Sequence, residues 1–334
     1  MEFIFQAYRR LHHPKKIFFL SCFFFLSFAL LFSQTNIEQA EELYHQKEYL
    51  KAKPLLKSYL KANPTDERTQ MYLGDIAMFQ KDFERALEYY TLLVERFPNN
   101  ADYQFRYGGA LAYHVQEMPK VKAVFYVDDI EESFLKAAKL DPSHIEARWA
   151  LIEFYIQLPY LLGGGEEKAL IYAKELAELS KVDGHLAKGY IADQNDRKKD
   201  AEYHYKKAVE IGGSMHTYDK LSTHYEKSGN AQKSLETKLS AKTKHKRNQL
   251  NYQIGRIVAE YNLDAETGIT ALNEFIERHS FQDSVGKEWA YLRLAQIYRK
   301  NGAKSQAELW VKKALTERED FKEAKIEREN ISKL

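Results

Sequence analysis

The sequence is poor in cysteine, glycine and proline, and each shortage excludes a class of structure. Cys22 is the only cysteine of the 334 residues, so the chain can form neither an internal disulfide nor a cysteine zinc cluster. The 15 glycines and 7 prolines lie well below their usual combined share of about 12%. Because tight turns depend on these residues, the shortage favours long helices over many short strands.

The chain also lacks a strong excess of charge of either sign. It has 50 Lys and Arg against 48 Asp and Glu, which gives a formal charge of +2. Binding to nucleic acid requires a strongly basic surface, so no nucleic-acid partner is predicted. Hydrophobic residues make up 44% and charged residues 29%, as in folded soluble proteins. The length allows two ordinary domains or one elongated repeat array.

Motifs of catalytic or metal chemistry are scarce. No HExxH motif occurs, and no two of the eleven histidines are spaced i, i+4 as metal ligands on a helix would be. His216 and His224 are interpreted as surface histidines. Ser58 and Lys61 match the S-x-x-K pattern without its companion motifs. The sequence therefore predicts no enzyme, no cofactor and no metal site.

Two further segments have a structural and a functional interpretation. Gly163–Gly165 is glycine-rich like a phosphate loop, but Glu166 and Glu167 follow it where a phosphate would lie. A flexible elbow leading into a helix from Glu166 is the favoured interpretation. Residues 238–247, KLSAKTKHKR, contain five basic residues and no acidic one. They are predicted to be a solvated helix end, and a site for a polyanion or an anionic lipid is the alternative.

The N-terminus has the pattern of an export signal. Arg9, Arg10, Lys15 and Lys16 precede an apolar run over residues 17–32, which contains no charge. This order is typical of a secretory signal peptide, and we expect residues 1–33 to be removed. The predicted location is the periplasm or cell envelope of a bacterium. An uncleaved anchor in the inner membrane is the alternative, although a spanning helix needs about 20 residues.

A period of 34 residues organises the remaining chain. The segments 40–64 and 74–98 superpose, and each ends at a proline, Pro64 or Pro98. Each reads as two helices joined by a short turn, at 46–47 in the first segment and at 80–81 in the second. Because proline cannot continue a helix, it separates each unit from the next.

This pattern resembles the tetratricopeptide repeat family, in which each repeat is a pair of antiparallel helices. The resemblance implies an all-α, right-handed α-solenoid of about eight helix pairs over residues 36–318. Insertions fall near 114–129, 156–168 and 279–288. Residues 319–334 are predicted to be a capping helix, which covers the last apolar face of such an array. The insertion at 114–129 either extends a second helix and packs locally or folds over the inner surface.

The repeat register places a small residue where the two helices of a pair approach each other. The first-helix positions are Ala40, Gly74, Gly108, Ile152, Gly189, Ser222, Gly255 and Ala295. The second-helix positions are Ala52, Ala86, Ile130, Ala169, Ala201, Ser234, Gly268 and Ala307. In the second pair we expect Gly74 and Ala86 to face each other.

In the resembled family the first helices line a concave groove that receives a peptide or a partner's helix. The resemblance places nine residues on this surface: Met71, Asp75, Met78, Phe105, Trp149, Glu153, Tyr190, Tyr252 and Arg256. The alternative is that several of them, Trp149 above all, pack between repeats. The predicted function is a non-catalytic protein-interaction scaffold of the bacterial cell envelope. A membrane-anchored envelope-assembly factor, held by residues 17–32 and contacting membrane or cell wall, is the other hypothesis.

Overall fold

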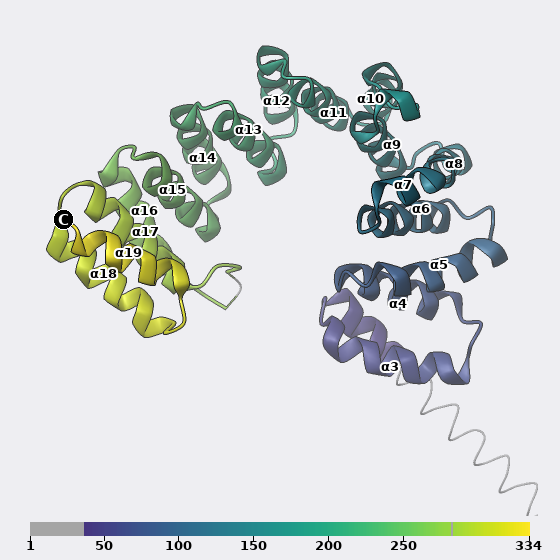
Figure 1. Cartoon of the computed structure of the whole chain (residues 1–334), viewed down its shortest axis with the longest axis horizontal. Helices are drawn as coiled ribbons and strands as arrows, with labels where there is room; N and C mark the ends of the chain where they lie inside the picture. The colour runs from purple at the N-terminus through teal and green to yellow at the C-terminus, as the bar shows by residue number, and fades with distance from the viewer. Residues whose placement is uncertain (1–36, 282) are drawn as a thin grey trace, which may run out of the picture. The chain divides into compact units, whose positions relative to one another are not determined.

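The computed structural model describes residues 37–281 and 283–334, and every element in this part of the chain is helical (Figure 1). The predicted signal peptide, 1–33, with its apolar run over 17–32, lies outside the described residues. The chain divides into two compact units, Met1–Leu151 and Ile152–Leu334. The division falls inside the helix over residues 145–157.

The first unit contains three complete helix pairs. A helix over residues 37–45 precedes α3 (Tyr49–Ala62) and forms the first pair with it. The second pair is α4 (Glu67–Phe79) with α5 (Phe83–Arg96). The third pair is α6 (Ala101–Gln116) with α8 (Val127–Leu140), separated by α7 (Lys120–Ala123) and the 3-10 turn η1 (Val124–Tyr126). The fourth pair begins here with α9 (Ile145–Gln157), which continues into the second unit.

The second unit completes the series. After the 3-10 turn η2 (Tyr160–Leu162), α10 (Glu166–Leu179) is the second helix of the fourth pair. Pairs five to eight are α11 (Lys181–Gln194) with α12 (Lys198–Ile211), α13 (Met215–Lys227) with α14 (Ala231–His245), α15 (Asn248–Tyr261) with α16 (Ala265–Glu277), and α17 (Lys287–Lys300) with α18 (Lys304–Glu317). The last helix is α19 (Lys322–Ser332). The prediction of eight helix pairs and a capping helix is therefore confirmed.

In the first unit α3 to α6 pack in chain order and α6 packs against α8, and in the second unit every helix from α10 to α19 packs against the next. In the second unit the first helices of neighbouring pairs also touch, as α11 does with α13 and α15 with α17. The capping helix covers the end of the array, because Phe321, Ala324 and Ile331 are buried in one apolar cluster with residues of α17 and α18. This is the layered packing expected of a helical repeat array.

The sequence period reappears as a period in the hydrogen bonds. Gln70 donates from Nε2 to the carbonyl of Pro64 at 2.9 Å, and Gln104 donates to that of Pro98 at the same distance. Both glutamines are buried. The amide groups therefore satisfy the carbonyls that are left free where each proline ends a repeat. Each of the next helices then starts at a capping side chain, Asp66 for α4 and Asn100 for α6.

All sixteen small-position residues predicted from the register are buried. A Cβ atom added to Gly74 would lie within 3.0 Å of the Tyr90 ring. Tyr90, one turn further along α5 than Ala86, therefore covers the glycine, and the facing of Gly74 and Ala86 stays a prediction. In the sixth pair the two small positions do meet, since the hydroxyl oxygens of Ser222 and Ser234 lie 2.7 Å apart.

The insertion in the third pair extends the second helix backwards. Helix α7 runs through η1 into α8 with nearly continuous helical dihedral angles. Val121 is 78% exposed and Phe125 is 79% exposed, whereas Tyr126 and Val127 are half-buried. The backbone thus follows the first of the two alternatives, with side-chain burial confined to part of the segment.

The glycine run in the fourth pair is a hydrogen-bonded turn. Gly164 donates its backbone N–H to the carbonyl of Pro159 at 3.2 Å, and Gly165 donates to that of Tyr155 at 2.9 Å. Gly163 has a φ of 91°, in the left-handed region that favours glycine. The following helix begins at Glu166, as predicted.

Candidate functional site

The predicted first-helix residues of the second pair are largely built into the structure. Met71 and Met78 of α4 are half-buried and pack against the apolar cluster that contains Tyr90 and Leu93. Asp75 lies between them in the sequence, and its side chain is only 15% exposed. None of the three is a fully open side chain on the surface.

Asp75 is the centre of a polar cluster that joins three first helices. Its carboxylate accepts hydrogen bonds from the hydroxyl of Tyr44 at 2.5 Å and from that of Tyr90 at 2.6 Å. It also forms an ion pair with Arg106 of α6. Burial raises the pKa of both tyrosines, and the Asp75 carboxylate raises it further. Asp75 therefore stabilises the array rather than offering a free charge to a ligand.

Phe105 and Trp149 occupy the same repeat position as Met71, three residues before the small residue. The Phe105 ring is half-buried, with its centroid 5.1 Å from that of His144 and 6.2 Å from that of Phe134. Trp149 is also half-buried, on α9. This position thus contributes both to packing and to the accessible surface.

In the second unit, three successive first helices bring together groups of different charge. The Glu153 side chain of α9 is exposed. Partial desolvation by the surrounding atoms raises the pKa of its carboxyl, and the positive charge of Lys220 on α13 opposes this shift. Tyr190 of α11 is half-buried. Burial raises the pKa of Tyr190, a hydrogen bond from Gln157 opposes the shift, and the Glu153 carboxylate adds to it. The Glu153 carboxylate of α9 thus lies within electrostatic range of the Tyr190 phenol on α11 and of the Lys220 ammonium on α13.

Tyr252 and Arg256 of α15 are not available to a binding partner in the way that Glu153 and Tyr190 are. Tyr252 is 8% exposed and belongs to the apolar core, where its ring centroid lies 5.5 Å from that of Phe275. Arg256 forms ion pairs with Glu226 at 2.9 Å and with Glu260 at 2.5 Å. These two residues support the packing of α13, α15 and α16.

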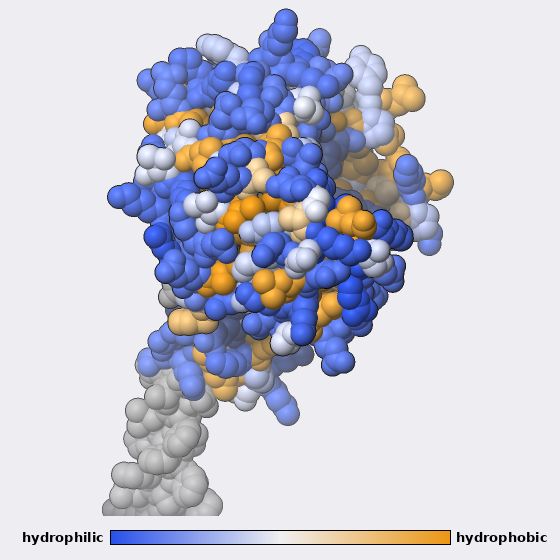
Figure 2. All heavy atoms as spheres, turned by 90° about the vertical axis from the view of Figure 1, so that its left-hand side faces the viewer, coloured by the Kyte–Doolittle hydropathy of each residue, from blue (hydrophilic) through white to orange (hydrophobic). Residues whose placement is uncertain are grey.

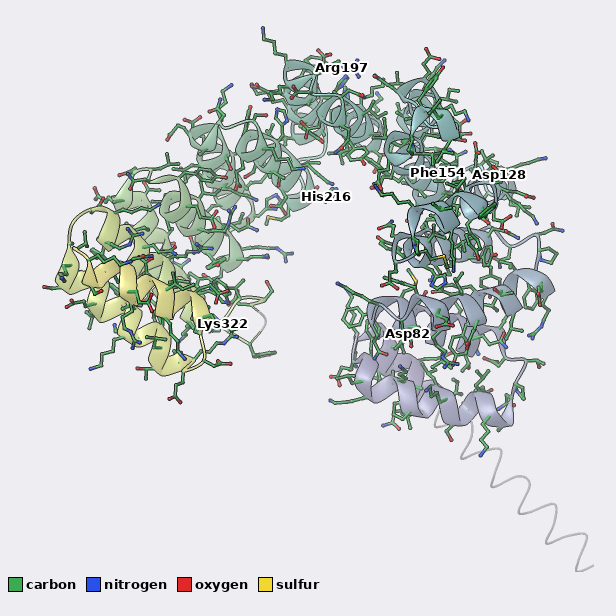
Figure 3. All side chains as sticks on the ribbon, viewed as in Figure 1. Asp82, Asp128, Phe154, Arg197, His216 and Lys322 are labelled. Atoms are coloured by element: carbon green, nitrogen blue, oxygen red, sulfur yellow. The ribbon has the colours of Figure 1, made fainter. Side chains whose placement is uncertain are left out.

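A set of polar contacts between neighbouring first helices was not predicted from the sequence. His224 of α13 lies 2.6 Å from the Asp193 carboxylate of α11 and is buried, so its interpretation as a surface histidine is wrong. His216, labelled in Figure 3, is exposed on α13 as predicted. The partners in the contacts His224–Asp193 and Arg106–Asp75 are both 31 residues apart. Complementary polar residues at nearly the repeat length were the signal that could have revealed them.

Two of the five basic residues over residues 238–247 pair with acidic groups, and Lys244, Lys246 and Arg247 are exposed. Lys238 is buried and pairs with Asp219, and Lys242 pairs with Glu274 at 2.8 Å. His245 contacts the carbonyl of Gly213 at 2.9 Å. These contacts favour the structural interpretation of the segment over a polyanion site.

The described residues show few features of other site types. Within residues 37–281 and 283–334, no three His, Cys, Asp or Glu side chains are grouped so as to hold a metal ion. None of the helices in these ranges is both long and apolar enough to span a bilayer. The face of the molecule shown in Figure 2 is mostly hydrophilic, with hydrophobic side chains in scattered groups.

Comparison with known proteins identifies the repeats. Models of the tetratricopeptide repeat match residues 43–105 and 290–321, so the chain contains tetratricopeptide repeats. No curated protein matches the sequence.

Several solved structures of repeat proteins are similar to the chain. A thermophilic tetratricopeptide repeat protein from Thermus thermophilus has 19% identity and a TM-score of 0.49, over 57% of this chain and 98% of its own. A tetratricopeptide repeat protein from Parabacteroides merdae has 13% identity and a TM-score of 0.45, over 90% and 98%. YrrB, described as a TPR protein with an unusual peptide-binding site, has 16% identity and a TM-score of 0.41, over 59% and 97%.

Proposed function

We propose that the protein is a non-catalytic scaffold that binds a protein or peptide through the accessible faces of its first helices. The observation that carries this proposal is the group formed by Glu153, Tyr190 and Lys220 on α9, α11 and α13. Other polar residues of the first helices, such as Asp75 and Arg256, are used in internal contacts. The group on α9, α11 and α13 therefore remains for an external partner.

The physical basis is the surface that a repeat array creates. Stacked helix pairs form an extended surface without a deep catalytic pocket, and such surfaces bind other chains. Tyrosine and methionine are enriched at protein interfaces, tyrosine because its ring buries a large area and methionine because its flexible side chain adapts to irregular surfaces. Tyr190, Met71 and Met78, all half-buried, have this character.

We further propose that the scaffold acts in the bacterial cell envelope. This part rests on the basic residues before position 17 and on the apolar run over residues 17–32. Retention of this run as an anchor is the alternative, and the assembly of envelope components at the membrane would then be its role.

The test is capture of partner proteins by the chain without residues 1–33. The tagged protein and its Glu153→Lys/Tyr190→Ala variant are incubated with an envelope extract of the source cells, and bound proteins are quantified by mass spectrometry. We expect at least one partner to be retained by the parent protein and reduced at least tenfold with the variant. A Leu309→Ala variant, changed at an exposed second-helix position on α18, is the control. Equal capture by all three proteins would exclude the first-helix group as the binding site.

A further inference from the structure

A cleft in the first unit lies between two second helices and has a first helix as its floor. Its walls come from α5 and α8 and its floor from α6, three elements visible in Figure 1. The cavity volume is about 350 Å³. Val94 and Tyr107 contribute apolar surface to it, and Gln104 is buried beneath them. The cleft contains none of the first-helix residues assigned to the proposed function.

The cleft continues as a shallower hollow along α5. This hollow has a volume of about 570 Å³ and shares Thr91 and Glu95 with the cleft. It adds Leu87, which is half-buried, and Leu92, which is exposed. Because α5 has 14 residues, the combined surface follows about 21 Å of helix, enough for four turns of a second helix laid beside it.

The walls of this surface carry carboxylates without counter-ions. Glu84, Glu95, Asp129 and Glu132 form no ion pair with any residue in the described part of the chain, and all four are exposed. The first helices differ in this respect, because Asp75 of α4 and Glu226 of α13 are each paired with an arginine of the next first helix, α6 or α15.

The remaining charges do not neutralise the walls. Glu88 pairs with Arg85 at 2.5 Å, and among the described residues Lys136 is the one cation that lines the cleft. Asp128, labelled in Figure 3, adds an exposed carboxylate next to Asp129 at the start of α8. The surface thus combines apolar side chains of α5 and the Tyr107 ring of α6 with a negative potential along both walls.

We propose that this surface binds a basic amphipathic helix of a partner protein. Apolar side chains of that helix, spaced i, i+3, i+4 and i+7, would cover Leu87, Leu92 and Val94. Lysine or arginine side chains on its flanks would pair with Glu95 and Glu132 on the two walls. Phosphate-bearing ligands are disfavoured, because membranes and nucleic acids present the same sign of charge as these walls.

The binding test uses the full chain and synthetic peptides as probes. The probes are fluorescein-labelled 18-residue amphipathic peptides with Leu, Phe or Met on one face and Lys on its flanks, together with copies in which every Lys is replaced by Glu. Fluorescence anisotropy is measured at 150 mM salt, so that long-range attraction is largely screened. We expect at least one basic peptide to bind with a micromolar Kd and the acidic copies not to bind.

The site is assigned by matched charge reversals. The Glu95→Lys/Glu132→Lys variant is expected to raise the Kd at least tenfold. The Glu178→Lys/Glu308→Lys variant has the same change in net charge at exposed positions of α10 and α18, and it is expected to change the Kd less than twofold. If the first variant does not fold, as judged by circular dichroism, Glu95→Gln/Glu132→Gln takes its place with an expected threefold or greater effect.

A third variant tests the apolar contribution. Leu92→Ser is expected to raise the Kd about fivefold without changing the melting temperature, because Leu92 is exposed in the free protein. The proposal is overturned if no basic peptide of the panel binds, if the acidic copies bind equally well, or if both charge reversals weaken binding equally. This outcome is independent of the first-helix variants, so either proposal can fail without the other.

Discussion

Replacing Gly74 by alanine tests the packing between the two helices of a repeat. The new Cβ would lie 2.8 Å from Cζ and 3.0 Å from Cδ1 of the Tyr90 ring, closer than van der Waals contact permits. Tyr90 is buried and cannot rotate into solvent. The ring must therefore shift, which also disturbs the 2.6 Å hydrogen bond from its hydroxyl to Asp75.

The expected magnitude follows from three opposing contributions. Overpacking costs about 1–3 kcal/mol, and weakening a hydrogen bond to a charged acceptor adds about 1 kcal/mol. The higher helix propensity of alanine returns about 1 kcal/mol. We expect the Gly74→Ala variant to lose about 1–3 kcal/mol in free energy of unfolding.

Gly109 provides a matched control on the neighbouring first helix. Apart from the surrounding turns of its own helix backbone, no atom lies within 4 Å of a Cβ added there, so Gly109→Ala gains the same helix propensity without a clash. Urea denaturation followed by circular dichroism should separate the two variants by about 2–4 kcal/mol. Hydrogen exchange in α4 and α5 should show that the loss is local, because repeat arrays are coupled mainly between neighbours. Equal stability of the two variants would refute the contact of Gly74 with Tyr90.

The fold was predictable because it repeats. Two copies of a 34-residue pattern, with Pro64 and Pro98 at their ends, fix the length of a helix pair and the position of its turn. Even Ile130 and Ile152, which break the rule of small residues, are buried as the register requires. A periodic pattern carries this information because each position is sampled several times along one chain.

The precise contacts between side chains were less predictable than the register. Long side chains on a helix point back towards its N-terminus. For this reason Tyr90, rather than Ala86 one turn earlier, covers Gly74. Gly189 is covered by Tyr205 in the same way, sixteen residues further along the chain. The sequence shows which faces meet, whereas rotamers decide which atoms touch.

The candidate site was the least predictable part. The register assigns Tyr252 and Phe105 to the same position, three residues before a small residue. A residue at this position lies about one turn before the small buried residue, on nearly the same face of the helix. Its exposure to solvent therefore depends on the neighbouring helix. Phe105 remains half-buried, whereas Tyr252 is enclosed by the core around Phe275. Solvent access at such positions is set by contacts between repeats, which no single repeat encodes.

Three further predictions test export, packing and titration. Mass spectrometry of the native protein should find a new N-terminus between residues 28 and 36, and an intact Met1 in the soluble cytoplasm would contradict export. Phe105→Ala should lower the free energy of unfolding by about 2 kcal/mol, roughly half the cost at a fully buried site, because the half-buried ring contacts His144; a thermal melt measures this. His185 and His204 face each other with their Nδ1 atoms 3.0 Å apart, and burial lowers the pKa of both. In the unfolded chain these histidines keep the ordinary histidine pKa of about 6.5, so they bind protons there before they do in the folded protein. As the pH falls below this value, the folded state therefore loses the stability that it has at higher pH. Melting temperatures at pH 7.5 and 5.5 should differ less in a His204→Gln variant than in the parent protein or in a variant at the exposed His216. Were the three proteins to respond identically to pH, the histidine pair would not be a source of the acid sensitivity.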